Sequence, residues 1–374
     1  MKIALLSESR AGVTQRGIYP QLITDLVLAL SYIGGVIVIL LRDRLLPARF
    51  FYDGLHIQQI AQLERSSAID SSYGVVGLSY RFVGLQNLPL LTGLISFSIF
   101  FLIVMSVRRQ VSIQKLGPTG LLMIAVTLFL GAVYLGYYSK DVFVLPLVML
   151  ALASRKHWSL DILLLVGMLS YATWFRSYWF LVAVAFVGLR WLATGPRAIQ
   201  KIIVGSFFAA GIFGMLLSLI LGIDPNHFRT TSNAGRQEGV DAGSMITPFF
   251  TGSGIWVGVL NVLSAWVSIV VPVPLALKGS FYYLALAMAI FAIWASIVKS
   301  FQITSFASEE PSAEQKRAMS LLFSFVAVQA LFEPDYGSVL RHLTPLLPLV
   351  ILLVLRAESI DRPMHANVAR RALH

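Results

Sequence analysis

The 374-residue sequence contains no cysteine and few charged residues. Without cysteine the chain has no disulfide, no thiol nucleophile and no cysteine-ligated zinc or iron–sulfur cluster. Charged residues make up 13% of the chain, whereas a soluble domain usually has about 25%. So few charges cannot cover a surface that faces water, and this excludes a soluble globular enzyme.

Hydrophobic residues are correspondingly abundant, at 57% of the chain, with a mean hydropathy of +0.77. The 29 lysines and arginines outnumber the 18 acids and give a net charge of +11. In so apolar a chain this surplus favours basic loops beside a membrane over a nucleic-acid partner. The composition predicts one domain, residues 1–374, with an all-α fold: a polytopic integral membrane helix bundle.

Apolar runs long enough to span a bilayer, or nearly so, predict about ten transmembrane helices. The predicted spans are 22–41, 89–107, 118–137, 142–154, 159–174, 178–194, 202–222, 280–298, 318–332 and 343–356. A further apolar run, 255–277, is interrupted by Pro272 and Pro274. Because proline removes hydrogen bonds from a helix interior, we interpret this run as a re-entrant or interfacial hairpin.

The distribution of basic residues predicts the orientation. Most of the 29 fall on the inner side if both termini are cytoplasmic. Polar residues fill the first 20 positions, so we expect no cleavable signal peptide. The two longest connections, 42–88 and 223–279, then lie outside, and long loops in a compact protein usually carry function. We therefore expect the active-site face to be periplasmic or extracellular.

Charged residues near the outer ends of the spans are the candidate site residues. Asp53 is the second residue of a stretch, from Tyr52 to about Arg65, that has the spacing of an amphipathic helix. It could cap that helix or orient a sugar hydroxyl. Lys140 and Asp141 lie in the short connection after the third span. They could form a substrate-binding pair, or be a snorkelling lysine beside a capping aspartate.

Arg176 lies among aromatic residues, including Tyr178, in a tight connection between two short spans. A charged group at membrane depth pairs with an opposite charge or lines a polar cavity. Arginine also offers a planar fork for phosphate oxygens. Arg176 therefore predicts an anion site, with a protein partner such as Asp141 as the alternative.

Two arginines, Arg229 and Arg236, lie in the second long connection, which is rich in glycine and asparagine. This composition suits a mobile loop that closes over an anionic or sugar ligand. A loop that is merely solvated would have a similar composition.

The last outer element contains Glu333, Asp335, Arg341 and His342 within ten residues. If residues 338–342 open the final span, the arginine and the histidine lie in its first turn, where the helix dipole favours an anion. The histidine could act as a general base. Alternatively, these ionisable groups could simply satisfy one another.

No Walker A sequence, GxSxG elbow, HExxH helix or calcium loop is present in the sequence. Glu333, Asp335 and His342 could ligate a metal, but their spacing matches no standard site. We expect neither an essential metal nor a cofactor.

These residues together resemble the Wzy-type polymerases of O-antigen, capsule and exopolysaccharide assembly. The resemblance rests on Ser139-Lys140-Asp141 at a span mouth, Arg176 followed by Tyr178-Trp179, and 333–338 followed by Arg341-His342. The plan of spans, with both ends inside and a large late outer loop, is similar too.

The resemblance implies glycosyl transfer at the periplasmic face of a bacterial inner membrane. A glycan on undecaprenyl diphosphate would be moved onto another lipid-linked repeat unit, without metal or nucleotide sugar. Arg176, Arg236, Arg341, and with them Lys140 and Arg229, would hold the leaving diphosphate. His342, Asp335, Glu333 or His227 would activate the acceptor hydroxyl. The implied partners are lipid-linked oligosaccharides, membrane lipids, a chain-length regulator and a flippase, and no nucleic acid.

Three alternatives stay open. An O-antigen ligase has the same architecture and differs in its acceptor. A GT-C glycosyltransferase would need an essential acid in the first outer loop, for which Asp53 is the candidate. A transporter or flippase of lipid-linked sugars would usually have inverted repeats and charges at the midplane. The clustering of polar residues at one face favours surface chemistry over transport.

Overall fold

The computed structural model describes residues 5–64, 71–111, 116–154, 157–234, 242–306 and 310–371. Nearly all of these residues are helical, as the sequence predicts, and their one β contact is an isolated antiparallel bridge between Met245 and Asp335. The elements in chain order are α1 (Leu5–Leu40), α2 (Arg42–Leu45), η1 (Ala48–Phe50), α3 (Tyr52–Ala61), α4 (Ser71–Phe82), α5 (Pro89–Val111), α6 (Pro118–Leu135), η2 (Lys140–Val144), α7 (Leu145–Leu152), α8 (Trp158–Trp174), α9 (Trp179–Leu192), α10 (Ala198–Leu221), α11 (His227–Ala234), η3 (Ala242–Ser244), α12 (Ile255–Val270), α13 (Val273–Ala276), α14 (Phe281–Phe306), α15 (Ala313–Phe332), α16 (Tyr336–Leu343), η4 (Thr344–Leu346) and α17 (Leu347–Arg371).

Six segments among the described residues are long and apolar enough to cross a membrane, and each overlaps a predicted span. They are Gln21–Leu40, Pro89–Val111, Pro118–Leu135, Ala198–Leu221, Phe281–Thr304 and Tyr336–Ile360. Helices α8, α9 and α12 are apolar but shorter, with 17, 14 and 16 residues. The predicted span 142–154 differs most, because it begins as the 3-10 turn η2 and its α-helix α7 has only eight residues.

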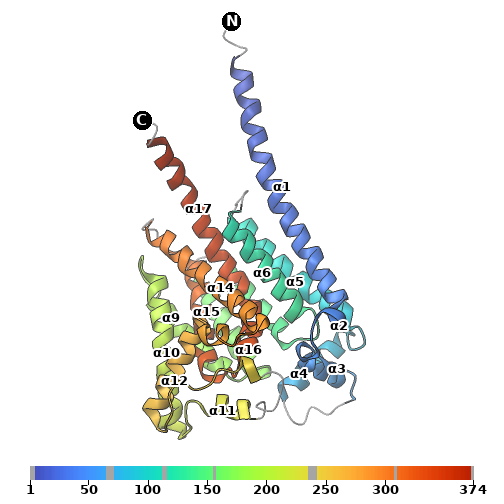
Figure 1. Ribbon diagram of the computed structural model, residues 1–374, viewed down its shortest axis with the longest axis vertical. Coiled ribbons are helices and arrows are strands. Elements are labelled where there is room, and N and C mark those ends of the chain that lie inside the picture. The colour runs from blue at the N-terminus through green and yellow to red at the C-terminus, as the bar shows by residue number, and fades with distance from the viewer. Residues whose placement is uncertain are drawn as a thin grey trace.

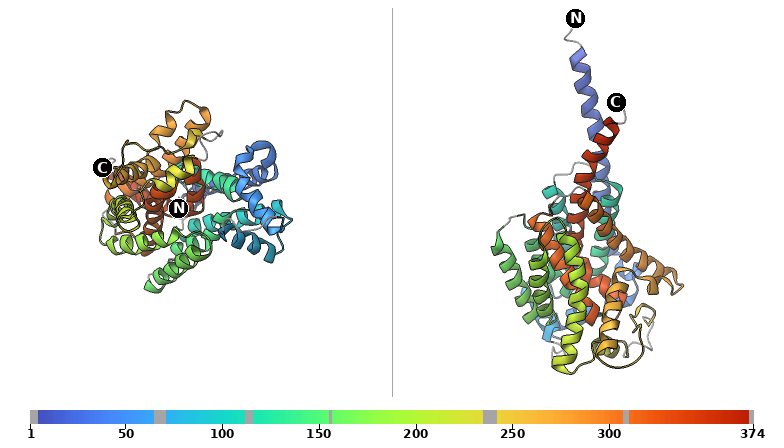
Figure 2. Two further views of the ribbon diagram at one scale, coloured as in Figure 1. Left: turned by 90° about the horizontal axis from the view of Figure 1, so that it is seen from below. Right: turned by 90° about the vertical axis from the view of Figure 1, so that its left-hand side faces the viewer.

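The helices run back and forth along the long axis of the molecule (Figure 1). The N-terminal end of α1 and the C-terminal end of α17 extend from the same end of the bundle (Figure 1, Figure 2). Helices α3, α4 and α11 lie at the opposite end, which we call the far end. The connections that contain the sequence-predicted site residues meet at the far end.

Helix α15 is the centre of the bundle, with all but three of its 20 residues buried. It packs against α9, α10 and α12, while α17 packs against α5, α6 and α14. The outer helices instead expose large apolar side chains, such as Phe208, Ile212 and Leu219 of α10. Exposed apolar faces around a buried central helix are the arrangement expected of a bundle in lipid.

The predicted interruption of the 255–277 run is present. Helix α12 ends at Val270, Pro272 is the N-cap of α13, and α13 ends after four residues. Gly258 near the start of α12 faces Pro225 at the far end. Leu277, just after α13, lines a cavity with Tyr336, also at the far end. Pro272 therefore divides the run into a 16-residue helix and a single four-residue turn, and the run does not form one continuous helix.

The first long connection is folded rather than an open loop. Helices α3 and α4 pack on each other, and Ile57, Val76 and Tyr80 form a second small core with Tyr137 and Tyr138. Within the described residues, the predicted amphipathic helix of 52–65 corresponds to α3. This small core holds α3 and α4 against the end of α6, directly beside Asp141.

Candidate functional site

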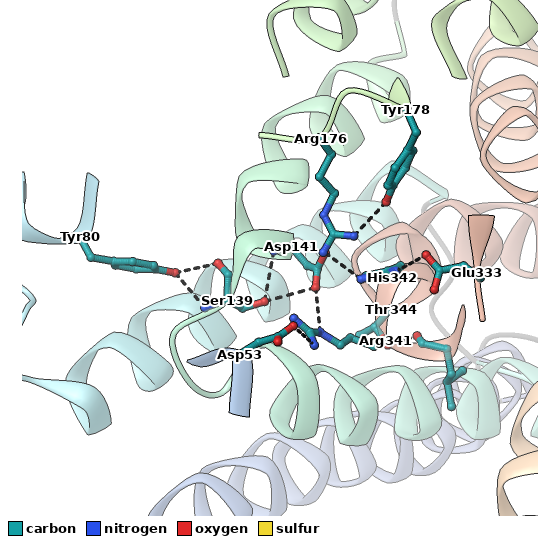
Figure 3. A network of polar contacts seen from close by, with 11 residues as sticks. Asp53, Tyr80, Ser139, Asp141, Arg176, Tyr178, Glu333, Arg341, His342 and Thr344 are labelled. Carbon is teal, nitrogen blue, oxygen red and sulfur yellow. Dashed lines mark hydrogen bonds and ion pairs between the residues drawn. The ribbon is translucent and has the colours of Figure 1, made fainter. Parts of the chain in front are cut away.

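Asp141 lies at the centre of a buried polar cluster at the far end (Figure 3). Helix α6 ends at Leu135, and the chain turns through Ser139 into η2. The Ser139 hydroxyl accepts a hydrogen bond of 3.1 Å from the Asp141 amide, and Tyr80 Oη donates to the Ser139 carbonyl at 3.0 Å. Serine, not aspartate, caps this turn, so the Asp141 carboxylate is available for other groups.

Arg176 reaches Asp141 from the corner between α8 and α9. Its Nη2 lies 3.2 Å from Asp141 Oδ1, and its Nη1 donates to Tyr178 Oη at 3.0 Å. Its Nε is buried and has no hydrogen-bond partner within the described part of the chain. The alternative drawn from the sequence, pairing with Asp141, is therefore what the structure has, and one N–H group is left over.

Arg341 approaches the other oxygen of the same carboxylate. Its Nε lies 3.2 Å from Asp141 Oδ2, and its Nη1 lies 2.5 Å from Asp53 Oδ2. Phe51, not Asp53, is the N-cap of α3, and it has no side-chain cap bond. Asp53 therefore serves as an ion-pair partner rather than as the helix cap that the sequence allowed.

The predicted position of Arg341 and His342 in the first turn of a helix is wrong. Helix α16 begins earlier, at Tyr336, because Asp335 caps it by accepting a 2.8 Å hydrogen bond from the Ser338 amide. The two basic residues consequently lie in its last turn. The positive end of the α16 dipole therefore does not contribute to an anion site at these residues.

His342 links Asp141 to Glu333. Its Nδ1 lies 2.9 Å from Glu333 Oε1, and its Nε2 lies 4.0 Å from Asp141 Oδ1 (Figure 3). His342 and Glu333 are both buried. An ionised carboxylate only accepts hydrogen bonds, so in the neutral ring Nδ1 carries the proton and Nε2 is the acceptor. This is the geometry of a histidine that a carboxylate orients for proton abstraction.

Lys140 lies at the edge of this cluster, beside α4. Its ammonium is 3.3 Å from Ser72 Oγ and 3.3 Å from the centre of the Tyr73 ring. Tyr73 and Tyr80 are seven positions apart, so they lie on one face of α4 and both turn toward the 139–141 turn. These tyrosines were not among the residues predicted from the sequence, although their helical spacing was a usable signal.

The charges keep the three carboxylates of the cluster ionised. Burial acts to raise the pKa of Asp141, but Arg176, His342 and Arg341 lower it to about 2. Burial also opposes ionisation of Asp53 and Glu333. Nevertheless, Arg341 holds the pKa of Asp53 well below its usual value, and His342 lowers the pKa of Glu333. The ionised carboxylates of Asp53, Asp141 and Glu333 thus face the positive charges of Arg176, Arg341 and Lys140.

Of the other predicted residues, Arg229 and His227 lie outside the charged cluster. Arg229 is fully buried, and its guanidinium donates to the carbonyls of Ala330 and Glu333. These bonds close the C-terminal end of α15 and hold the 333–335 turn. His227 begins α11, where its ring lies beside Phe228. Arg236 lies outside the described residues.

The described residues contain no group of three or more histidines and carboxylates arranged to hold a metal ion. The cluster instead brings two guanidinium groups and an oriented histidine within reach of one point. Such groups can bind an anion and accept a proton from a hydroxyl. No family model matches the chain, and comparisons with curated proteins and with solved structures likewise found no match.

Proposed function

We propose that this protein is a membrane glycosyltransferase that polymerises oligosaccharide repeat units carried on undecaprenyl diphosphate, at the periplasmic face of a bacterial inner membrane. One observation carries the proposal. Arg176, Arg341 and His342 come from two distant segments of the chain and meet around Asp141 at one end of an apolar helix bundle. In the proposed orientation this end of the bundle would lie near the membrane surface, where a lipid diphosphate presents its charge.

In the proposed reaction, the acceptor hydroxyl of one lipid-linked unit attacks the anomeric carbon of the sugar on another. The new C–O bond forms as the bond from that carbon to the diphosphate breaks, and the diphosphate leaves with the bonding electrons. The guanidinium groups of Arg176 and Arg341 stabilise the charge that develops on it. His342 Nε2 takes the hydroxyl proton, and Glu333 stabilises the imidazolium that forms.

Asp141 is a positioning residue in this proposal. One carboxylate oxygen holds each arginine, so both guanidinium planes are fixed before the substrate arrives. Asp53 is the carboxylate that an incoming diphosphate would displace, because its side chain is 37% exposed and that of Asp141 only 3%. An exposed partner is held less strongly than a buried one.

The first test is the length of cell-surface glycan after deletion of the protein and complementation with variants. Wild type should restore a ladder of long chains. Arg176→Lys and Arg341→Lys keep the charge but lose the fork that holds two oxygens, so they should leave mainly single repeat units. Arg81, an exposed arginine of α4 outside the cluster, provides the matched control. Arg81→Lys should restore the full ladder at the same membrane abundance.

Two outcomes would contradict the polymerase. A full ladder with both Arg176→Lys and Arg341→Lys would show that the two arginines are not needed for polymerisation. Long glycan that accumulates unattached on its lipid carrier in the deletion strain would make the protein a ligase instead.

A GT-C glycosyltransferase is the second candidate, because Asp53, the acid that this class would need in the first outer segment, contacts Arg341 in the cluster. In that case Asp53 itself would act on the acceptor, and its carboxylate would be essential.

A further inference from the structure

A separate cavity of about 300 Å³ lies at the far end, beside the charged cluster. Its walls include Thr247 and Phe249, Lys278 just after α13, and Tyr336 at the start of α16. The volume is at the lower end of the range for small-molecule sites, which starts at about 300 Å³. The cavity can therefore hold a small ligand or one part of a larger one.

The segment that forms one wall, residues 245–250, is fixed by hydrogen bonds at both ends. The Ile246 amide donates to the Pro334 carbonyl at 2.8 Å, and Asn233 Nδ2 donates to the Ile246 carbonyl at 3.3 Å. At the other end, Asn261 Oδ1 accepts from the amides of Phe249 and Phe250 at 2.7 and 2.8 Å. Asn261 Nδ2 also donates to the Phe250 carbonyl at 3.0 Å. A wall held in this way is preorganised for a ligand.

The exposed groups of the cavity have a mixed chemistry. Phe249 is 44% exposed and offers an aromatic face. Thr247 and Lys278 are exposed too, and neither side chain makes a hydrogen bond or an ion pair with the residues that the structure describes. The three basic groups of the charged cluster, in contrast, all have partners. Lys278 is thus a cation open to an anionic ligand.

We propose that this cavity binds an acidic sugar residue of the glycan, such as a uronic acid. The apolar face of the ring would lie on Phe249, the carboxylate on Lys278, and a ring hydroxyl on Thr247. The cavity shares the 333–336 segment with the cluster, because Met245 bridges Asp335 and Tyr336 is the next residue. This assignment rests on the proposed function, and it adds the class of sugar that the protein selects.

Saturation-transfer NMR on the purified protein in detergent tests the proposal directly. Methyl glucuronide and methyl glucoside differ only in the carboxylate. We expect the wild type to bind the glucuronide about threefold more tightly, the gain typical of a partly exposed charge pair. Added salt should reduce this preference.

Three variants sharpen the test. Lys278→Gln should bind the two glycosides equally, and Phe249→Ala should weaken the binding of both. Phe250→Ala is the matched control, because Phe250 is the next residue and is similarly exposed, but it does not line the cavity. It should bind as the wild type does. Equal binding of both glycosides by the wild type, binding of neither, or an equal loss with Phe250→Ala would overturn the assignment.

Titration of inorganic pyrophosphate separates this proposal from the proposed function. Arg341→Lys should lose affinity for pyrophosphate and keep its affinity for the glucuronide. If the glucuronide binds as expected while the cluster variants leave the glycan ladder intact, the sugar site stands and the polymerase does not. If the cluster variants lose the ladder but the wild type shows no preference for the glucuronide, only the assignment of the sugar site is contradicted.

Discussion

At the scale of single residues, the cluster is organised around one carboxylate that serves two arginines. Removal of one member of a buried, hydrogen-bonded ion pair costs about 3–5 kcal/mol, because the other charge stays buried without a partner. Asp141 is 2% exposed and lies between Arg176 and Arg341. Substitutions of Asp141 would therefore mix loss of folding with loss of function. Asp53, at the edge of the cluster, is the better residue to change.

Asp53→Asn is expected to strengthen pyrophosphate binding about tenfold or less, because it removes the carboxylate that competes for Arg341. The amide keeps the size of the side chain, so α3 should stay in place. Calorimetric titration of the purified protein measures the change, and the glycan ladder reports activity. A lost ladder with unchanged thermal stability would instead favour the GT-C candidate.

The sequence predicts part of this site from local rules. An arginine among aromatic residues in an apolar chain must have an anion or a carboxylate nearby, and that rule led to Arg176 and to Asp141 as its partner. No local rule indicates that Glu333 orients His342, or that Arg341 joins Asp53 to Asp141. Those contacts depend on how α3, η2 and α16 meet in three dimensions. Arg229 shows most clearly what local rules miss. A polar loop around this arginine suggested a ligand-binding role, but in the folded protein its guanidinium donates to backbone carbonyls.

At the scale of elements, the close approach of α5 to α6 sets the position of η2. A Cβ on Gly93 of α5 would overlap with the carbonyl oxygen of Gly136, at the end of α6. This contact is with backbone and cannot be relieved by a side-chain rotation. The turn that carries Asp141 follows directly, so a shift of α6 would also move the site.

Gly93→Ala is therefore expected to destabilise the protein by about 1–3 kcal/mol, the usual cost of overpacking. It should also shorten the glycan ladder. Gly34→Ala in α1 is the matched control, because nothing lies within 4 Å of its added Cβ. Thermal unfolding in detergent compares the two variants. Similar melting temperatures for both would show that α5 and α6 tolerate separation.

The elements themselves follow from the sequence to different degrees. Long apolar runs and the Pro272 break were predicted because length and proline act locally. The start of α16 was missed, since the capping of its first turn by Asp335 was not recognised. The folding of α3 onto α4 was missed as well, because it depends on contacts with Tyr137 and Tyr138.

At the scale of the whole molecule, charged groups gather at both ends of the bundle. At the end opposite the site, Asp161 pairs with Arg190 at 3.0 Å and with Arg317 at 2.6 Å. Arg356 pairs with Glu314 at 2.9 Å at the same end. This second network was not predicted from the sequence. These ion pairs connect α8, α9 and α15, and they lie away from the candidate site at the far end.

The absence of cysteine allows a direct test of orientation. Phe82→Cys lies at the end of α4 on the far side, at a residue that is 93% exposed. Lys201→Cys lies in the first turn of α10, at the opposite end from α11. A membrane-impermeant maleimide should label Phe82→Cys in spheroplasts, and Lys201→Cys only after the membrane is opened. The opposite pattern would place the cluster in the cytoplasm and contradict the proposed function.

The distance along the chain between Asp141 and Arg341 has a consequence for biosynthesis. The two residues are 200 positions apart, so a nascent chain places Asp141 and Arg176 in the membrane long before Arg341 and His342 have been translated. During that interval the cluster lacks Arg341 and His342. The candidate site is thus completed only when the last helices have been translated, and a chain interrupted before α16 contains Asp141 and Arg176 without two of their partners.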